Sequence, residues 1–140
     1  MVGLRKHPRR KSHDLLLQQD LAIAIRRSRR AHDEELKKEG FGILTEIDIK
    51  ATLKKKLDVD FRNYKILGAC NPPFAHKALE AESKIGTMLP CNVIVQETAD
   101  GAVEVAVVDP VASMQAVDNP DLGEIANVIQ GKLKAVVDRL

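Results

Sequence analysis

The run Tyr64-Lys65-Ile66-Leu67-Gly68-Ala69-Cys70-Asn71-Pro72-Pro73 predicts a strand that passes directly into a helix. Residues 64–70 form a short, mainly apolar segment. Successive side chains would point to opposite faces, as is typical of a strand. Asn71 is a favourable residue immediately before a helix, and proline is well accommodated in the first helical turn. The chain therefore contains at least one tight strand-to-helix junction.

The segment upstream of this junction predicts a further strand and two helices. Residues 41–47 alternate as a strand, and Gly40 before them is a stop signal for a helix over residues 14–39. Asp48 can cap a helix that runs to Leu57. Three lysines in its last turns suit the negative end of the helix dipole.

The segment downstream predicts a hairpin followed by a long helix. Two strands, residues 91–98 and 102–108, are joined by a turn that contains Asp100-Gly101, a hairpin signal. Residues 111–117 are expected to be irregular or a short helical turn. The C-terminal helix has a regular apolar stripe, formed by Leu122, Ile125, Ile129, Leu133, Val136 and Leu140.

This order of elements predicts a single α/β (α+β) domain over residues 31–140. Helices with one apolar stripe and strands with one apolar face pack as a two-layer α/β sandwich, with a mixed or antiparallel sheet and the helices on one face. The 140-residue chain is 44% hydrophobic, which is enough for a core, but it has no Trp, one Tyr and three Phe. The core is expected to be aliphatic.

Residues 1–30 differ from the rest of the chain in charge. They carry nine Lys or Arg against two Asp, whereas the remaining residues carry 13 basic and 18 acidic side chains. We expect a basic extension or a diverged first element here, with residues 1–13 a mobile arm. Nucleic-acid binding is not favoured, since aromatic side chains are scarce. No run is long and apolar enough to span a membrane, and a cytoplasmic protein is expected.

Four segments together resemble the domain-of-unknown-function family number 302. The similarity covers roughly residues 33–140, with the segments in the expected order and spacing: Glu39–Asp48, Ile66–Pro72, Ala75–Leu79 and Leu89–Val93. The resemblance implies a two-layer α/β fold and a homodimer, and it implies no established activity. It also implies a first strand and an acidic helix before Gly40, where this chain instead has Arg26-Arg27-Ser28-Arg29-Arg30.

The two cysteines are the best indication of chemistry. Each is followed by asparagine, as Cys70-Asn71 and Cys91-Asn92, and each has a proline nearby. Two thiols that met at one end of the sheet could hold a soft metal, with His76 as a third ligand, or form a reversible disulfide. The alternative is that both are small core residues.

These observations predict a small ligand-binding or sensing domain. The candidate ligand-binding residues are Cys70, Asn71, His76, Cys91, Asn92 and Glu46, and the candidate metal ligands are Cys70, Cys91 and His76. A non-enzymatic role is favoured because no complete catalytic set is present. The competing hypothesis is a structural, dimeric interaction module with core cysteines. No particular cofactor or small ligand is indicated beyond a possible soft metal.

Overall fold

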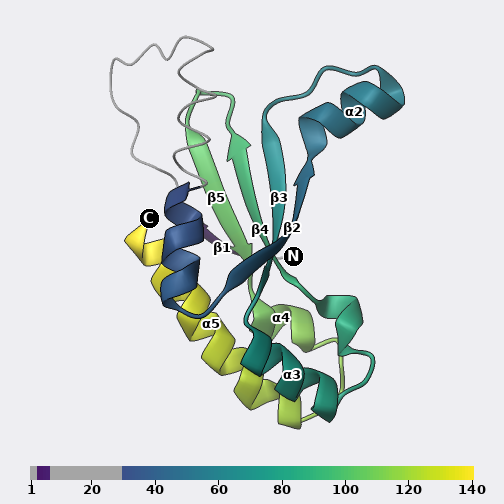
Figure 1. Ribbon diagram of the computed structural model, residues 1–140, viewed down its shortest axis with the longest axis vertical. Coiled ribbons are helices and arrows are strands. Elements are labelled where there is room, and N and C mark those ends of the chain that lie inside the picture. The colour runs from purple at the N-terminus through teal and green to yellow at the C-terminus, as the bar shows by residue number, and fades with distance from the viewer. Residues whose placement is uncertain (1–2, 7–29) are drawn as a thin grey trace.

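The computed structural model describes residues 30–140 and the backbone of residues 3–6, and Figure 1 shows their arrangement. A five-stranded antiparallel sheet has the order β1-β5-β4-β3-β2. Its strands are β1 (Gly3–Lys6), β2 (Gly42–Asp48), β3 (Tyr64–Cys70), β4 (Cys91–Glu97) and β5 (Val103–Val108). The predicted α/β class is confirmed, and of the two predicted kinds of sheet the antiparallel one is present.

Apart from α2, the helices form the second layer and extend beyond the strand ends. They comprise residues 30–38, α2 (Ile49–Leu57), α3 (Pro72–Ala81), the 3-10 helix η1 (Ile85–Met88), α4 (Pro110–Met114) and α5 (Asp121–Arg139). In Figure 1, α5 runs beside the sheet, and α3 and α4 lie at one end of it. Within the described residues, no helix has both the length and the apolar character that a membrane span requires.

The core lies between α5 and one face of the central strands. The buried residues of β4 alternate, as a strand period of two requires, whereas in β3 and β5 burial extends to both faces. The aliphatic core predicted from composition is present: the sheet contributes Leu67, Val93, Val95, Val105 and Val107, and α5 contributes Ile129, Leu133, Val136 and Val137.

Gly40 ends the helix of residues 30–38, as predicted. Its φ is 83°, a left-handed conformation that glycine adopts without a steric penalty. The Phe41 amide donates to the Leu36 carbonyl, and the Gly40 amide donates to the Lys37 carbonyl. This pair of bonds is a Schellman motif, and it turns the chain directly into β2.

The same helix is fixed against α5 by buried and charged contacts. His32 and Leu36 are buried, at 2% and 1% exposure. Burial lowers the pKa of His32 to about 4, because an imidazolium would lose its hydration there. On the outer side, Arg139 of α5 donates to the carboxylates of Glu35 and Glu39.

The strand β1 lies in the segment that the sequence predicted to be a mobile arm. Its backbone pairs with β5, from Gly3 opposite Val108 to Lys6 opposite Val105. For residues 3–6 the predicted arm is therefore wrong, because their backbone is paired in the sheet. Of the helix predicted over residues 14–39, the part over residues 14–29 lies outside the described residues, and the domain boundary near residue 30 stays a prediction.

The helix α2 projects from the sheet and buries no side chain. Figure 1 places it at the end of the molecule opposite α3 and α4. Asp48 caps it as predicted, since its carboxylate accepts from the Ala51 amide at 3.0 Å. Leu57 in its last turn is 66% exposed. The helix predicted after Asp48 is therefore present, but it does not contribute to the core.

Candidate functional site

A small cavity lies where β3 ends and α3 begins. Its volume is about 20 Å³, room for about one water molecule. The strand ends and their adjoining turns contribute Phe41, Ala69, Cys70, Leu89, Pro90 and Cys91 to its wall. The helices and the residue before α3 contribute Asn71, Phe74, Ala75, Ala78, Met114, Ile125 and Ile129. Asn71 is the only amide side chain in this wall, and the wall carries no charge.

Both cysteines contribute to this one cavity. Cys91, the first residue of β4, is opposite Ala69 of β3, so Cys70 is one residue beyond its partner. Cys91 is buried and Cys70 is partly buried, and neither forms a disulfide. The two cysteines therefore line the same cavity, whereas the meeting of their thiols and their use stay predictions.

The Cys91 thiol is strongly held in its protonated form. Burial, and to a smaller extent the proximity of Cys70, raise the pKa of Cys91 to about 11. Only about one molecule in 10,000 would carry the thiolate at pH 7. Cys91 is consequently a poor nucleophile as long as its thiol keeps the proton.

Asn71 does not cap α3 with its side chain, although the sequence predicted that it would. The side chain makes no capping hydrogen bond, and Pro72 and Pro73 occupy the first two helical positions. Proline has no N–H, so one of the two amides that a cap normally bonds is missing. Asn71 Nδ2 instead donates to the Glu39 carbonyl at 3.1 Å, which ties the cavity to the turn before β2.

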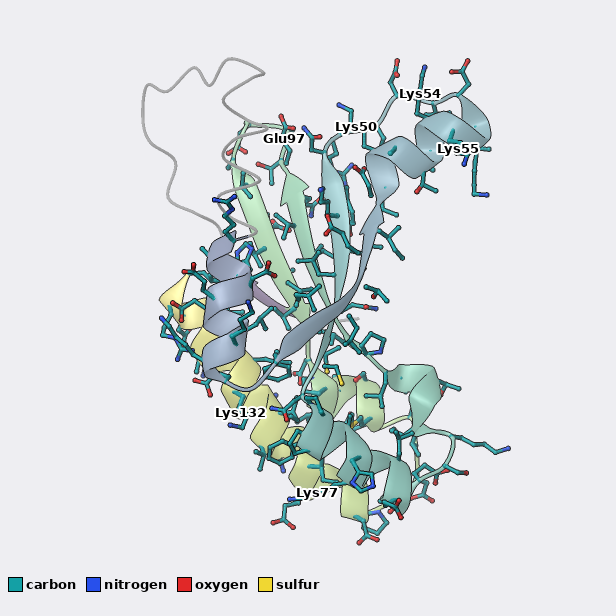
Figure 2. All side chains as sticks on the ribbon, in the orientation of Figure 1. Lys50, Lys54, Lys55, Lys77, Glu97 and Lys132 are labelled. Atoms are coloured by element: carbon teal, nitrogen blue, oxygen red, sulfur yellow. The ribbon has the colours of Figure 1, made fainter. Side chains whose placement is uncertain are left out.

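Two cations lie near the ring of Phe74, one of the residues that line the cavity. Lys77 Nζ of α3 lies 5.2 Å from the centre of this ring, and Lys132 Nζ of α5 lies 5.9 Å from it. Figure 2 shows both lysines at the α3 and α5 end of the molecule, far from Lys50, Lys54 and Lys55 on α2. The wall of the cavity is thus uncharged, and two lysines lie close to the ring of one of its residues.

Three other predicted site residues lie outside this cavity. His76 is 76% exposed on α3, and its Nε2 lies 3.3 Å from Glu80. Asn92 is exposed and follows Cys91, so strand alternation turns it to the opposite face. Glu46 of β2 pairs with Lys65 at 2.9 Å. A binding role for these three residues stays a prediction.

Met114 contributes a third sulfur-bearing side chain to the cavity, and the sequence analysis did not select it. It is 6% exposed and ends α4. The only nearby sequence signal was Asp109-Pro110, which indicates the start of a short helix. Met114 follows about one helical turn after this start. In the chain between residues 30 and 140, no three His, Cys, Asp or Glu side chains form a metal-binding group. A metal ion in this cavity would therefore have the Met114 thioether as a third ligand, or would be held by the two cysteines alone.

Replacing Gly68 with alanine is expected to lower the free energy of unfolding by about 1–3 kcal/mol through overpacking. A methyl group at this position would collide with the Thr45 hydroxyl oxygen and lie 2.7 Å from Cγ of Pro90. The Thr45 side chain can rotate away, but the proline ring is held in the wall of the cavity. Urea unfolding of the two proteins measures the difference.

Gly42→Ala is the matched control for this prediction. Gly42 lies on the neighbouring strand β2, and a methyl group there would meet no atom within 4 Å. The control is expected to unfold within about 0.5 kcal/mol of the original chain. Equal stability of the Gly68 and Gly42 variants would show that the sheet relaxes around the added methyl group.

Comparison with known proteins gives a family. Residues 20–140 match the family described as "Domain of unknown function DUF302". The chain is also similar to the crystal structure of an uncharacterized conserved DUF302 protein from Bacillus stearothermophilus, with 31% identity and a TM-score of 0.77. That similarity covers 82% of this chain and 89% of the other. No curated protein matches the chain. With most of its length matched, the chain belongs to the DUF302 family.

Proposed function

We propose that this domain binds a soft monovalent metal ion, Cu(I), between Cys70 and Cys91, and that it senses or carries this ion. The observation that supports the proposal is that the only two cysteines of the chain line one small cavity. Thiolate sulfur is a soft donor that selects Cu(I) and other soft ions.

The size of the cavity favours an ion over an organic ligand. Pockets for small organic molecules usually hold about 300–1,000 Å³. This cavity holds about 20 Å³, which suits one ion or one water molecule. Zn²⁺ would need about four ligands in a structural site. Two thiols without a nearby histidine or carboxylate therefore fit Cu(I) better.

Burial makes Cys91 a poor attacking thiol for a redox switch. A disulfide forms by attack of a thiolate, and the raised pKa of Cys91 means that this attack would have to come from Cys70. Cu(I) replaces the thiol proton directly, forming a Cu–S bond and releasing H⁺ without a change of oxidation state. His76, Asn92 and Glu46 have no part in this proposal because of their positions outside the cavity. Two reduced cysteines also support a cytoplasmic location.

The test is a competition for Cu(I) in the absence of oxygen, using reduced protein and a coloured Cu(I) chelator. One Cu(I) is expected per chain. Cys70→Ala and Cys91→Ala are each expected to weaken binding by about 100-fold or more, since each removes a ligand. Circular dichroism establishes that the variants fold. If the double variant holds Cu(I) as tightly as the original chain, or if oxidised glutathione converts the pair to a disulfide while Cu(I) is not retained, the proposal is wrong.

We infer in addition that two copies of the chain associate through α2 and β2. Four large apolar side chains in this region are 45–66% exposed: Leu44, Ile47, Leu57 and Val59. The lysines of α2 lie beside Asp58 and Asp60, which both approach Lys54. A patch that holds both charges next to apolar area can be complementary to itself, as a two-fold interface requires.

Light scattering after size exclusion tests this interface. The original chain is expected to have the mass of a dimer, and Leu57→Glu that of a monomer. Leu79→Glu, a change at an exposed leucine of α3, is the control and is expected to remain a dimer. A monomeric original chain would exclude the interface.

A further inference from the structure

We propose that the Met114 thioether is the third ligand of the Cu(I) ion, which gives a site of three sulfur atoms. This inference rests on the proposed function and names a residue from a different part of the fold. Cys70 and Cys91 belong to two neighbouring strands, whereas Met114 belongs to α4, and all three line the same cavity. Thioether sulfur shares with thiolate the softness that Cu(I) prefers.

The remaining wall offers no competing soft donor. Apart from the three sulfur-bearing residues, it consists of apolar side chains and Asn71. The NH₂ group of Asn71 is engaged with the Glu39 carbonyl. An amide oxygen is a hard donor that suits Ca²⁺ or Mg²⁺ rather than Cu(I). Met114 is thus the one residue in this wall that can complete a soft trigonal site.

The charge of the cavity also favours a neutral third ligand. Two thiolates and one Cu(I) ion carry a net charge of −1, and a third anionic donor would add to it. An uncompensated charge is costly in apolar surroundings. Lys77 and Lys132 lie close to the Phe74 ring, but neither of them lines the cavity. A thioether adds a metal bond without adding charge.

The fold holds Met114 in place before any ion arrives. Asp109 Oδ1 accepts from the Val111 amide at 3.0 Å, which begins α4, and from Gln130 Nε2 of α5 at 2.9 Å. The short helix is thereby fixed to both the end of β5 and α5. Met114 at its last position is 6% exposed, so its side chain has little freedom to leave the cavity. Such preorganisation favours binding, because the Met114 side chain loses little conformational entropy when the ion binds.

The first test compares Met114→Leu with Met88→Leu in the anaerobic Cu(I) competition. Leucine is similar in volume to methionine and keeps the core filled. Met114→Leu is expected to weaken Cu(I) binding by about 10- to 100-fold. Met88 is 36% exposed in η1 and does not line the cavity, so Met88→Leu is expected to bind as the original chain does.

The second test identifies the ligand directly. The chain is prepared with selenomethionine, loaded with Cu(I) and studied by X-ray absorption at the copper edge. A selenium neighbour of copper is expected in the original chain and in Met88→Leu, and its absence is expected in Met114→Leu. If Cu(I) binds with sulfur neighbours only and Met114→Leu binds equally well, this inference fails while the two-cysteine site stands. If the original chain does not retain Cu(I), the proposed function itself fails.

Discussion

Leu133→Ala is expected to lower the free energy of unfolding by about 3–4 kcal/mol. Leu133 is fully buried in α5, where it packs in the main core between the helix and the sheet valines. The substitution removes the transfer free energy of the lost methyl groups and leaves a cavity that its surroundings fill only in part. The antiparallel sheet on one side is held by four sets of strand pairs, which limits its collapse into that space. The loss of stability is therefore expected to lie well above the smallest losses that leucine-to-alanine substitutions cause in protein cores.

Urea unfolding followed by circular dichroism measures this loss. Val128→Ala, a change on the same helix at a position that is 40% exposed, is the matched control and is expected to stay within about 0.5 kcal/mol of the original chain. If the two variants lost similar stability, α5 would not be the helix that covers the core.

Acidification from pH 6.5 to pH 4 is expected to cost about 3 kcal/mol of stability through His32 alone. The imidazole is buried, and burial lowers its pKa from 6.5 to about 4 in the folded chain. Above pH 6.5 the group is neutral in both the folded and the unfolded state, so it adds no pH dependence. Between pH 6.5 and pH 4 only the unfolded state takes up the proton, so stability falls as the pH falls. Below pH 4 both states are protonated and the loss is complete.

Comparison with His32→Leu isolates this contribution from all other titrating groups. The free energy of unfolding is measured for both chains at several values between pH 4 and pH 7.5. The difference between the chains is expected to change by about 3 kcal/mol across that interval, because leucine binds no proton. Curves that run parallel at every pH would show that His32 titrates equally in the folded and unfolded chains.

Local sequence signals predicted most of the fold. Asp48 and Gly40 each determine the backbone only a few residues away. The start of α2 and the end of the preceding helix could therefore be predicted. The Asp100-Gly101 turn likewise predicted the pairing of β4 with β5. The strand β1 could not be found in this way. Its partner lies about 100 residues away, and its own residues have no apolar alternation to indicate a strand.

The candidate site was predictable only in part, since a cavity depends on elements distant in sequence. The matching positions of Cys70 and Cys91 at strand boundaries indicated that they could meet, and both line the cavity. His76 lies only six residues from Cys70, but the turn of α3 places it in solvent. Met114 was not selected because nothing close to it in sequence belongs to the site.

The pairing of β1 with β5 has a consequence for shortened versions of this protein. A chain that lacked its first residues would leave β5 as the outermost strand, with a row of unsatisfied main-chain donors and acceptors. The β5 segment, Val103-Glu104-Val105-Ala106-Val107-Val108, is rich in β-branched residues and contains a single charge. Segments of this kind readily recruit identical strands from other molecules into fibrils. The pairing of β1 with β5 is thus expected to protect the chain from such aggregation.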